Sequence, residues 1–297
     1  MCYDECRDVF RGCRKEKAMK KFASLVSLVL ILALLSGCGG EKLGQSQPST
    51  EPQTTLSPTV KVTFPEGFTA VQIAQRLEES DVCPASDFIR VVQSPGEIAD
   101  DFPFLAEINN PEERPFLLEG FIFPDTYEFY RGESAESVLK RFLKNTASKL
   151  SDEFTLRAGQ LGYTLDQVII LASIIQKEVG LKEEMGKVSS VLHNRLENPD
   201  FPKLQCDATI NYIKRFVTDS EYLTGNETDF DALYNTYKCD GLSAGAICNP
   251  GLDAIQAALY PEKTDYYFFV TGNNNQYYYA ATYPEHQENC RLCGIDG

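Results

Sequence analysis

Glu178 is the acidic residue whose setting in the sequence best suits catalysis. The stretch "LASIIQKEVG" runs from Leu171 to Gly180, and Ile175, Ile174 and Leu171 lie three, four and seven residues before Glu178. At helical spacing these positions share one face, so the carboxylate lies on an apolar stripe, just before the stop that Gly180 predicts. Loss of water and the negative end of the helix dipole both favour the protonated form. A carboxylic acid that keeps its proton near neutral pH is suited to general acid catalysis.

A structural role is the alternative for Glu178, because a helix-end glutamate also reaches solvent or pairs with a lysine. Other segments of the chain favour catalysis. They are, in chain order, "LEGFIFPDTYEF", "LASIIQKE", "VSSVLHNRL", "LQCDATINY", "YNTY", "GLSAGAICNPG" and "EHQEN". Their order and spacing resemble the endolytic murein transglycosylase family, also called the YceG-like family, over roughly Val60 to His286. Several linked motifs in order are more specific than any one of them.

The resemblance implies a reaction and a role for Glu178. The family cleaves the β-1,4 bond between N-acetylmuramic acid and N-acetylglucosamine in peptidoglycan, and it leaves 1,6-anhydro-muramyl ends. Glu178 occupies the position of the family's catalytic glutamate, which donates a proton and then takes one back. A second carboxylate is not needed, unlike in most glycosidases, because the attacking hydroxyl belongs to the substrate. The resemblance implies glycan strands and cell-wall synthesis proteins as partners, and no cofactor.

The same motifs supply candidate substrate-binding residues. Amides and tyrosines suit sugar hydroxyls and sugar ring faces. These candidates are Asn194, Arg195, Gln205, Asp207, Tyr234, Asn235, Tyr237 and His286. Each has a structural alternative: Arg195 lies near an apolar stripe and is expected to pair with a carboxylate, and His286 suits a structural histidine. Glu119 and Asp125 are expected to be structural, and Asn249 with Pro250 to shape a turn.

The chain departs from the family pattern at several positions near these motifs. Gln176 stands where the family has the first acid of "EKE", and this change leaves the second acid, Glu178, in place. Cys206 and Ala208 replace Thr and Pro of the usual "QTDPT", and "GLSAGAICNPG" replaces "GLPPGPIANPG". We expect these differences to alter the loops beside the candidate site rather than to remove the chemistry.

The N-terminal region predicts export and lipid attachment. From Met19, two lysines precede an apolar run that ends in Leu35-Ser36-Gly37-Cys38, which is typical of a lipoprotein signal peptide at 19–38. Cys38 is then the lipidated residue, and the body is expected on the outer face of the cell membrane. Residues 1–18 are interpreted as an upstream extension, with translation starting at Met19. The segment 39–59 is polar and rich in Pro, Ser and Thr, which predicts a disordered linker.

Charge and cysteine content exclude some functions. A net charge of −15 argues against nucleic-acid binding, which needs a basic surface. The cysteines of the body are Cys83, Cys206, Cys239, Cys248, Cys290 and Cys293. Outside the membrane they are able to form disulfides, but their pairing is open. "CRLC" is the one CxxC, and two histidines add little, so we predict no metal site.

The periodicities predict an α+β fold made of a small LysM-like module at 60–115 and a mixed helical and β catalytic domain at 116–297. The module has a strand from Val60, a helix after a capping box at Thr69, and a short helix capped by Ser86. The domain has a β-prone segment at 116–132, helices at 134–150 and 164–180, and helices around 189–196 and 254–259. The tyrosine-rich segments on either side of "TGNNN" predict a hairpin.

Three functional hypotheses remain open at this point. The first is a membrane-tethered lytic transglycosylase. The second is a wall-binding lipoprotein without activity, against which the presence of Glu178 argues. The third is a glycoside hydrolase that uses Glu178 together with a carboxylate such as Asp207. Glycan length and stem-peptide preference, oligomeric state and protein partners are not encoded in any recognisable motif.

Overall fold

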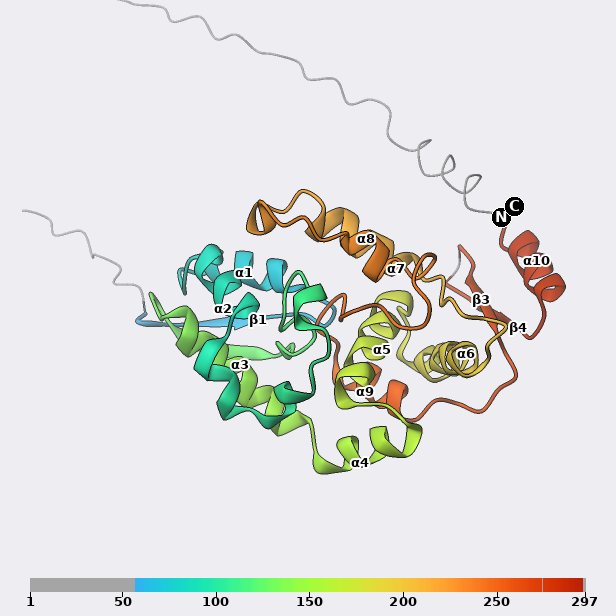
Figure 1. The fold of residues 1–297 in the computed structure, drawn as a ribbon, viewed down its shortest axis with the longest axis horizontal. Coiled ribbons are helices and arrows are strands. Elements are labelled where there is room, and N and C mark those ends of the chain that lie inside the picture. Colours follow the sequence, from blue (N-terminus) through green and yellow to red (C-terminus); the bar gives the residue numbers. More distant parts are fainter. Residues whose placement is uncertain (1–56, 274, 296–297) are drawn as a thin grey trace, which may run out of the picture. The chain divides into compact units, whose positions relative to one another are not determined.

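The fold begins with a strand whose partner lies far along the chain. The computed structural model describes residues 57–273 and 275–295. β1 (Thr59–Thr63) pairs antiparallel with β2 (Thr126–Tyr130), with Thr59 opposite Tyr130 (Figure 1). Alternation along the strands places Val62, Tyr127 and Phe129 on the buried face of the pair.

Helices make up most of the remaining regular structure. The α-helices are α1 (Ala70–Glu79), α2 (Ala85–Gln93), α3 (Ala135–Lys149), α4 (Asp152–Leu161), α5 (Leu165–Glu178), α6 (Met185–Glu197), α7 (Asp207–Tyr212), α8 (Phe230–Tyr234), α9 (Leu252–Leu259) and α10 (Tyr283–Leu292). Short 3-10 turns occupy Gly96–Asp101, Pro103–Glu107, Pro111–Glu113, Lys182–Glu184 and Glu221–Leu223, and a π-helical turn occupies Ile213–Val217. The strands β3 (Phe268–Thr271) and β4 (Tyr277–Ala280) pair antiparallel, which confirms the predicted hairpin.

The first two helices differ from each other in how they are capped. α1 has the predicted capping box, in which Thr69 and Gln72 exchange hydrogen bonds. The prediction that Ser86 caps α2 is wrong, because the cap residue is Pro84. The N–H of Ala85, the first helical residue, instead donates to Oε1 of Glu78 at 3.1 Å, so α1 supplies the acceptor that the cap lacks.

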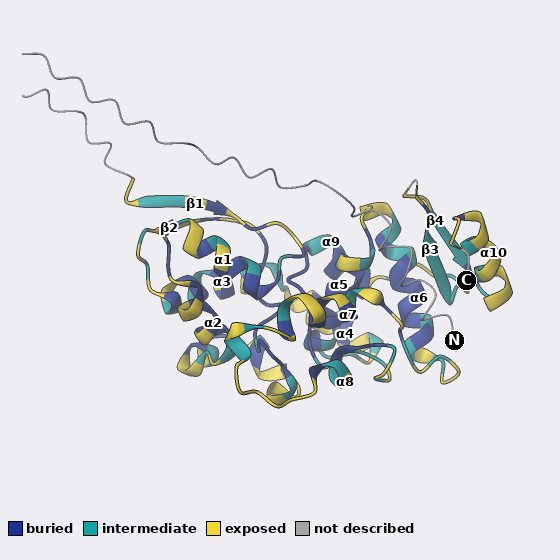
Figure 2. Cartoon of the chain, turned by 90° about the horizontal axis from the view of Figure 1, so that it is seen from above, coloured by how far each residue is buried: buried dark blue, intermediate teal, exposed yellow. Residues whose placement is uncertain are grey.

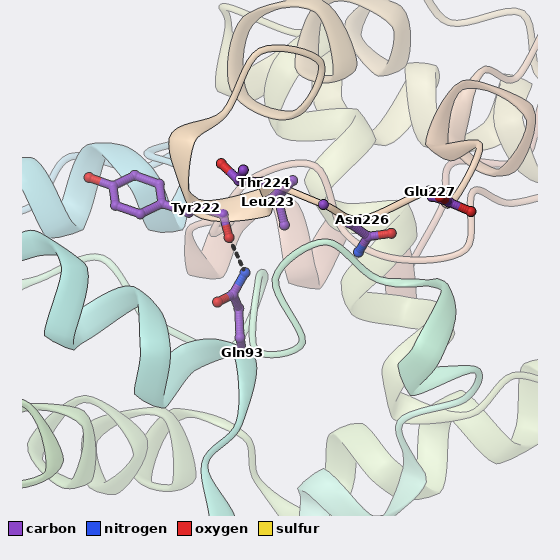
Figure 3. A pocket seen from close by; sticks show the side chains of 7 residues that line it. Gln93, Tyr222, Leu223, Thr224, Asn226 and Glu227 are labelled. Atoms are coloured by element: carbon purple, nitrogen blue, oxygen red, sulfur yellow. Dashed lines mark hydrogen bonds between the residues drawn. The ribbon is translucent and has the colours of Figure 1, made fainter.

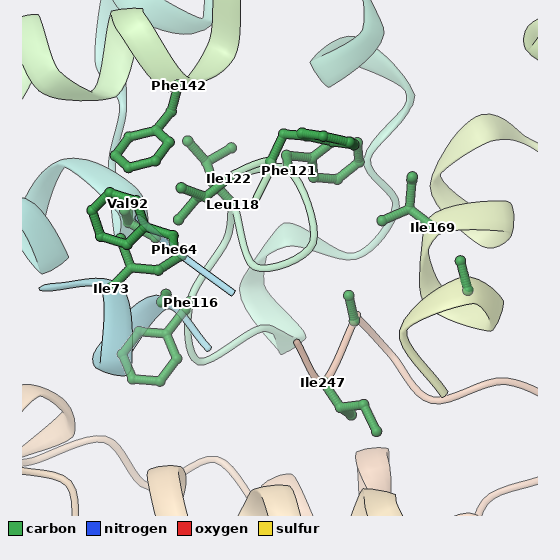
Figure 4. Close-up of a cluster of buried hydrophobic side chains, with 14 of the residues drawn as sticks. Phe64, Ile73, Val92, Phe116, Leu118, Phe121, Ile122, Phe142, Ile169 and Ile247 are labelled. Carbon is green, nitrogen blue, oxygen red and sulfur yellow. The ribbon is translucent and has the colours of Figure 1, made fainter. Parts of the chain in front are cut away.

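α5 is the central buried helix of the described residues. It begins at the predicted capping box of Thr164 and Gln167. Its residues are buried along most of its length because α9, α4, α6 and α7 all pack against it (Figure 2). In its middle, Ser173 Oγ accepts the N–H of Ile247 at 3.0 Å, which fixes the neighbouring loop to the helix. Figure 4 shows Ile169 of α5 in the same apolar cluster as Phe121.

The β-prone segment at 116–132 forms one short strand rather than a long one. Only β2 is extended, and the residues before it form a tight loop. Asn249 stabilises this loop, since its Oδ1 accepts the N–H groups of Gly120 at 2.9 Å and Ile122 at 2.8 Å. Side-chain acceptors thus replace the sheet partners that a longer strand would need.

Glu119 ties this loop to α1. Its carboxylate accepts the N–H of Ala70, the first residue of α1, at 2.9 Å, and the Nδ2 of Asn249 at 2.7 Å. Tyr212 donates to the same carboxylate at 3.3 Å. The side chain is 2% exposed, and burial raises the pKa of Glu119 to about 8 although these donors act in the opposite direction. The structural role expected for Glu119 is consistent with this environment.

Several contacts cross the predicted domain boundary between residues 115 and 116. β1 lies before the boundary and its partner β2 after it, and Glu119 holds the start of α1. The described residues accordingly form one compact unit rather than two. The prediction assigned β2 to the catalytic domain at 116–297, although β2 pairs with β1 of the LysM-like module at 60–115. The pairing was not expected because the β-prone segment is far from β1 in the sequence.

The C-terminal part contains a helix that the sequence analysis did not predict. α10 begins at a capping box formed by Thr282 and Glu285, and it packs against β3 and β4. The signal peptide, Cys38 and nearly all of the linker lie outside the described residues. Within the described residues no single helix is long and apolar enough to cross a membrane, although α4 and α5 reach that length together with a bend of 88°.

Gly120 is a position where any side chain should destabilise the fold. Its φ is +95°, and a Cβ there would lie 2.7 Å from both Ala246 Cβ and Ile169 Cγ2. We expect Gly120→Ala to lower the free energy of unfolding by about 2–5 kcal/mol through backbone strain and overpacking. Gly162→Ala is the matched control, because its φ is +79° and nothing lies within 4 Å, which leaves strain alone. Urea denaturation of both variants measures the difference, and equal losses would contradict the overpacking.

Candidate functional site

Glu178 is the last residue of α5 and is half-buried. The helix ends there because Val179 takes an extended backbone conformation, with φ −118° and ψ 118°. The Oε1 atom of Glu178 accepts the backbone N–H of Ala208 at 3.1 Å. α5 therefore presents the carboxyl group to the segment that precedes and opens α7, and a main-chain donor holds one of its oxygens.

The surroundings of Glu178 favour its protonated form. Burial raises the pKa of Glu178 to about 7, the Ala208 N–H opposes this shift, and the charge of Asp207 adds to it. A carboxyl group with a pKa near neutrality is able both to donate a proton and to accept one. The prediction that Glu178 is protonated by an apolar setting thus agrees with the geometry, while its catalytic role stays a prediction.

Asp207 and Tyr237 lie next to this carboxyl group. The Tyr237 hydroxyl donates to Oδ1 of Asp207 at 2.9 Å. Asp207 is exposed and Tyr237 is half-buried. Burial and then the charge of Asp207 raise the pKa of Tyr237, so the phenol keeps its proton. Of the predicted substrate-binding residues, these two are brought together beside Glu178.

Gln205 belongs to the same segment. Its side chain is exposed and its backbone has φ +58°, a left-handed conformation that is uncommon for a residue with a side chain. The Gln205 N–H donates to Thr236 O at 3.1 Å, and its Oε1 accepts from Arg195 at 3.1 Å. This strained segment is therefore held from two sides, and it carries Asp207 and Ala208 to Glu178.

Among the described residues Arg195 pairs with no carboxylate, which contradicts that expectation. Its guanidinium donates to the carbonyl oxygens of Tyr267 at 2.8 Å, Leu204 at 2.9 Å and Lys203 at 3.1 Å. Arg195 is 7% exposed, and its acceptors are main-chain groups of the irregular 203–204 segment and of Tyr267, just before β3. Arg195 thus acts on the site through the loop that it fixes.

Other predicted substrate-binding residues are turned inward. Tyr234 is 1% exposed, and its ring lies 5.7 Å from that of Tyr212, so it belongs to the core and is not available to a sugar. Asn235 is 5% exposed and donates to Asp231. Asn194 donates to the carbonyls of Thr264 and Tyr266, which anchors the irregular segment that leads into β3. These side chains brace the loops around the site.

His286 lies on α10 and contacts the hairpin. Its ring stacks on Phe268 with the centroids 5.1 Å apart, and its Nε2 is 3.7 Å from Sγ of Cys290. Burial lowers the pKa of His286, and Arg195 lowers it further. This setting matches the structural alternative for the histidine.

Gln176, the first residue of the "QKE" segment, is held by a main-chain contact. Its Oε1 accepts the N–H of Gly251 at 2.9 Å, which a glutamate at this position would also do. Lys177 donates to Gly67 O at 3.2 Å. Both side chains anchor the last turn of α5 to other loops, so the substitution keeps the hydrogen bond and removes one charge.

Two contacts at the site were not predicted from the sequence. One is the Ala208 N–H, a main-chain group that no residue type reveals. The other is Tyr277 of β4, whose hydroxyl accepts the N–H of Gly180 at 3.0 Å. A tyrosine in a hairpin carries no sign that it reaches the end of α5, so only the tertiary structure identifies it.

The described cavities lie away from Glu178. One of about 620 Å³ is lined by Gln93 and the loop at 222–227, where Gln93 donates to Tyr222 O (Figure 3). A second, of about 320 Å³, is lined by residues of the 213–231 segment. Neither includes a residue that contacts Glu178, so the candidate site rests on its chemistry rather than on a cavity.

No set of three His, Cys, Asp or Glu side chains in the described part of the chain could hold a metal ion. Within residues 57–273 and 275–295, the thiols of Cys83, Cys206, Cys239, Cys248 and Cys293 are free. Cys206 is buried beside Arg195 and Glu178, and burial raises the pKa of its thiol well above the usual value. The Cys206 substitution thus places a neutral, apolar group next to the site.

Comparison with known proteins identifies the family. The model of the YceG-like family matches residues 42–292. The chain belongs to the YceG-like family. A putative YceG-like protein from Listeria monocytogenes, solved by crystallography, superposes with a TM-score of 0.65 at 29% identity, over 79% of this chain and 76% of that one. The YceG-like match and this superposition confirm the predicted mixed helix and strand fold.

Curated members of the YceG-like family carry a functional name. The endolytic murein transglycosylase of Bacillus subtilis strain 168 is 28% identical over 239 residues, which is 77% of this chain and 63% of the relative. That of Streptococcus pneumoniae strain D39 is 30% identical over 236 residues, or 74% of this chain and 42% of the relative. The chain thus spans less than two thirds of the length of these relatives.

Proposed function

We propose that this YceG-like chain is a peptidoglycan lytic transglycosylase with Glu178 as its single acid/base. The observation that carries the proposal is a half-buried carboxyl group at the end of α5 whose pKa is raised to about 7. It stands at the position that the motif resemblance gives to the catalytic glutamate. The names of the curated relatives support the same activity. The substrate is the bond between N-acetylmuramic acid and N-acetylglucosamine.

The reaction needs one group that moves a proton twice. Glu178 gives its proton to the glycosidic oxygen as the bond from C1 of the muramyl residue breaks. The 6-hydroxyl of the same residue attacks C1, and the Glu178 carboxylate accepts the proton of that hydroxyl. No water is consumed, and the enzyme returns to its starting state. The attacking group is part of the substrate, so the site does not have to position a water molecule.

The pH dependence of activity should follow the Glu178 carboxyl group. Its pKa in the folded protein is raised to about 7, so the proton required for the first step is present below this pH and lost above it. We expect kcat/KM to fall about tenfold per pH unit on the alkaline side of pH 7. The measurement is a pH profile of product formation on isolated glycan strands between about pH 5 and 9. A profile flat from pH 6 to about 9 would contradict this role.

Product analysis tests the reaction itself. Mass spectrometry of digested glycan should detect 1,6-anhydro-muramyl ends, which are lighter than reducing ends by one water. Reducing ends instead would identify a hydrolase that uses Asp207 as a second carboxylate. An absence of products with retained binding to glycan would identify a wall-binding protein. The assay therefore separates the three functional classes.

We also propose that Cys38 anchors the chain on the outer face of the cell membrane through a lipid, with 39–59 as the linker. In this arrangement the enzyme acts on nascent strands beside cell-wall synthesis proteins. Metabolic labelling with a fatty acid should mark the wild type and not Cys38→Ser. The order strand, helix, helix, strand from β1 to β2 supports a LysM-like element for glycan binding, with the second strand at β2.

A further inference from the structure

We infer that Asp207, held in place by Tyr237 beside Glu178, is a positioning residue whose negative charge adds to burial in favouring the protonated form of Glu178. This inference rests on the proposed function of Glu178 and assigns Asp207 a different role from the sugar contact predicted from the sequence. Asp207 then acts through Glu178 rather than on the glycan. It is a positioning residue in the electrostatic sense, since its charge biases the protonation state of the group that does the chemistry.

The backbone brings Asp207 to Glu178. Asp207 is the first residue of α7, and the N–H of the next residue, Ala208, donates to Glu178 Oε1 at 3.1 Å. The hydrogen bond to Glu178 therefore places the preceding residue, Asp207, beside it. The donor is a main-chain N–H, so on the α7 side this contact does not depend on a side-chain rotamer.

Tyr237 and its neighbour hold the Asp207 segment. The Tyr237 hydroxyl donates to Asp207 Oδ1 at 2.9 Å. One residue earlier, Thr236 accepts the N–H of Cys206 on its Oγ1 at 2.9 Å and the N–H of Gln205 on its carbonyl at 3.1 Å. An exposed aspartate would otherwise sample several rotamers, whereas this one is oriented by a phenol on a segment that is itself anchored.

Among the described titratable groups around Glu178, Asp207 is the one that brings a negative charge. Lys177, on the same helix, reaches away to Gly67 O. From α6, Arg195 is engaged by carbonyl groups. The Cys206 thiol and the Tyr237 phenol are neutral because burial raises the pKa of each. From β4, Tyr277 contributes a hydroxyl to Gly180. Among these groups Asp207 is the one whose charge raises the pKa of Glu178, second in size to burial among the effects that raise it.

This assignment separates the site from that of a two-carboxylate hydrolase. In such an enzyme the second carboxylate attacks the sugar or activates water. Here Asp207 accepts a hydrogen bond from Tyr237 and repels negative charge on Glu178. The second acid is then useful without touching the substrate, because two nearby carboxyl groups disfavour double ionisation.

A direct titration of Glu178 tests the inference without any assay of activity. The carboxyl carbon of Glu178 is followed by NMR in protein labelled with 13C-glutamate and is assigned by its loss in Glu178→Gln. We expect Asp207→Asn to lower the pKa of Glu178 by about half to one unit. Tyr237→Phe should shift it in the same direction by less. Asp219→Asn, which removes an exposed charge from the loop after α7, is the control and should leave it unchanged.

The outcomes of the titration separate the two proposals. An Asp207→Asn protein in which Glu178 titrates as in the wild type overturns the inference and leaves the proposed function standing. Wild-type protein that forms no anhydro ends overturns the proposed function, and the titration still reports on the Asp207 charge.

Kinetics of the same variant give a second test. In Asp207→Asn, the alkaline limb of the kcat/KM profile should move to lower pH by about half to one unit, as the pKa of Glu178 does in the titration. Activity near pH 5.5 should remain within about twofold of the wild type, because Glu178 is protonated there in both proteins. A loss that is equal at every pH would show that Asp207 contacts the substrate, and it would overturn the inference.

Discussion

The Glu178→Gln protein is expected to produce no detectable anhydro-muramyl ends, with kcat/KM reduced by about 10³-fold or more. Glutamine has the same shape and keeps an oxygen that is able to accept the Ala208 N–H, so the local structure should persist. It has no proton to give to the leaving oxygen and cannot take one from the 6-hydroxyl. The measurement is mass spectrometry of products over a time course on purified glycan.

Glu183→Gln is the matched control for that experiment. Glu183 is exposed in the 3-10 turn that follows α5, and the same chemical change there should leave the rate within about twofold. Thermal denaturation of both variants checks that the fold is intact. Anhydro ends formed by Glu178→Gln at the wild-type rate would remove Glu178 from the mechanism.

Arg114→Met is expected to cause the largest loss of stability, about 3–5 kcal/mol in the free energy of unfolding. Arg114 donates to both oxygens of Asp166, at 2.9 and 2.5 Å, and both side chains are 1% exposed. Methionine leaves the aspartate buried without its partner. The cost is large because the charge cannot return to water.

An exposed pair provides the comparison for Arg114. Arg90 bonds Glu136 at 3.1 Å, with side-chain exposures of 62% and 47%, so Arg90→Met should cost less than about 1 kcal/mol. Urea denaturation monitored by circular dichroism measures both. Similar losses in the two variants would contradict the importance of burial. Asp166 lies in the first turn of α5, so the Arg114 variant should also disturb the helix that ends in Glu178.

Local signals accounted for much of the fold. α5 was predictable because a capping box, a long apolar segment and a glycine stop all agree on its bounds, and the hairpin because tyrosine-rich strands flank a turn. α2 was misassigned at its start because the acceptor for its first N–H comes from Glu78 on another helix. The β1–β2 pair was missed because strand pairing depends on residues that lie far apart in the chain.

The candidate site was predictable in its central residue and less so in its surroundings. Glu178 could be singled out because an acid on an apolar stripe is unusual. Tyr234 and Asn235 could not be separated from Tyr237 by residue type, since the same motif sends two side chains inward and one toward Asp207. Arg195 shows the same difficulty: its partners are carbonyl groups, which every residue has.

The long-range contacts bear on when the chain becomes able to fold during synthesis or export. β1 has no strand to pair with until residues 126–130 have emerged, and the Gly180 N–H has no acceptor until Tyr277 has followed. Contacts of such sequence separation slow folding, because the intervening chain must be ordered first. The acid at the end of α5 therefore reaches its final environment only after residues up to Tyr277, about a hundred positions further along the chain, have been synthesised.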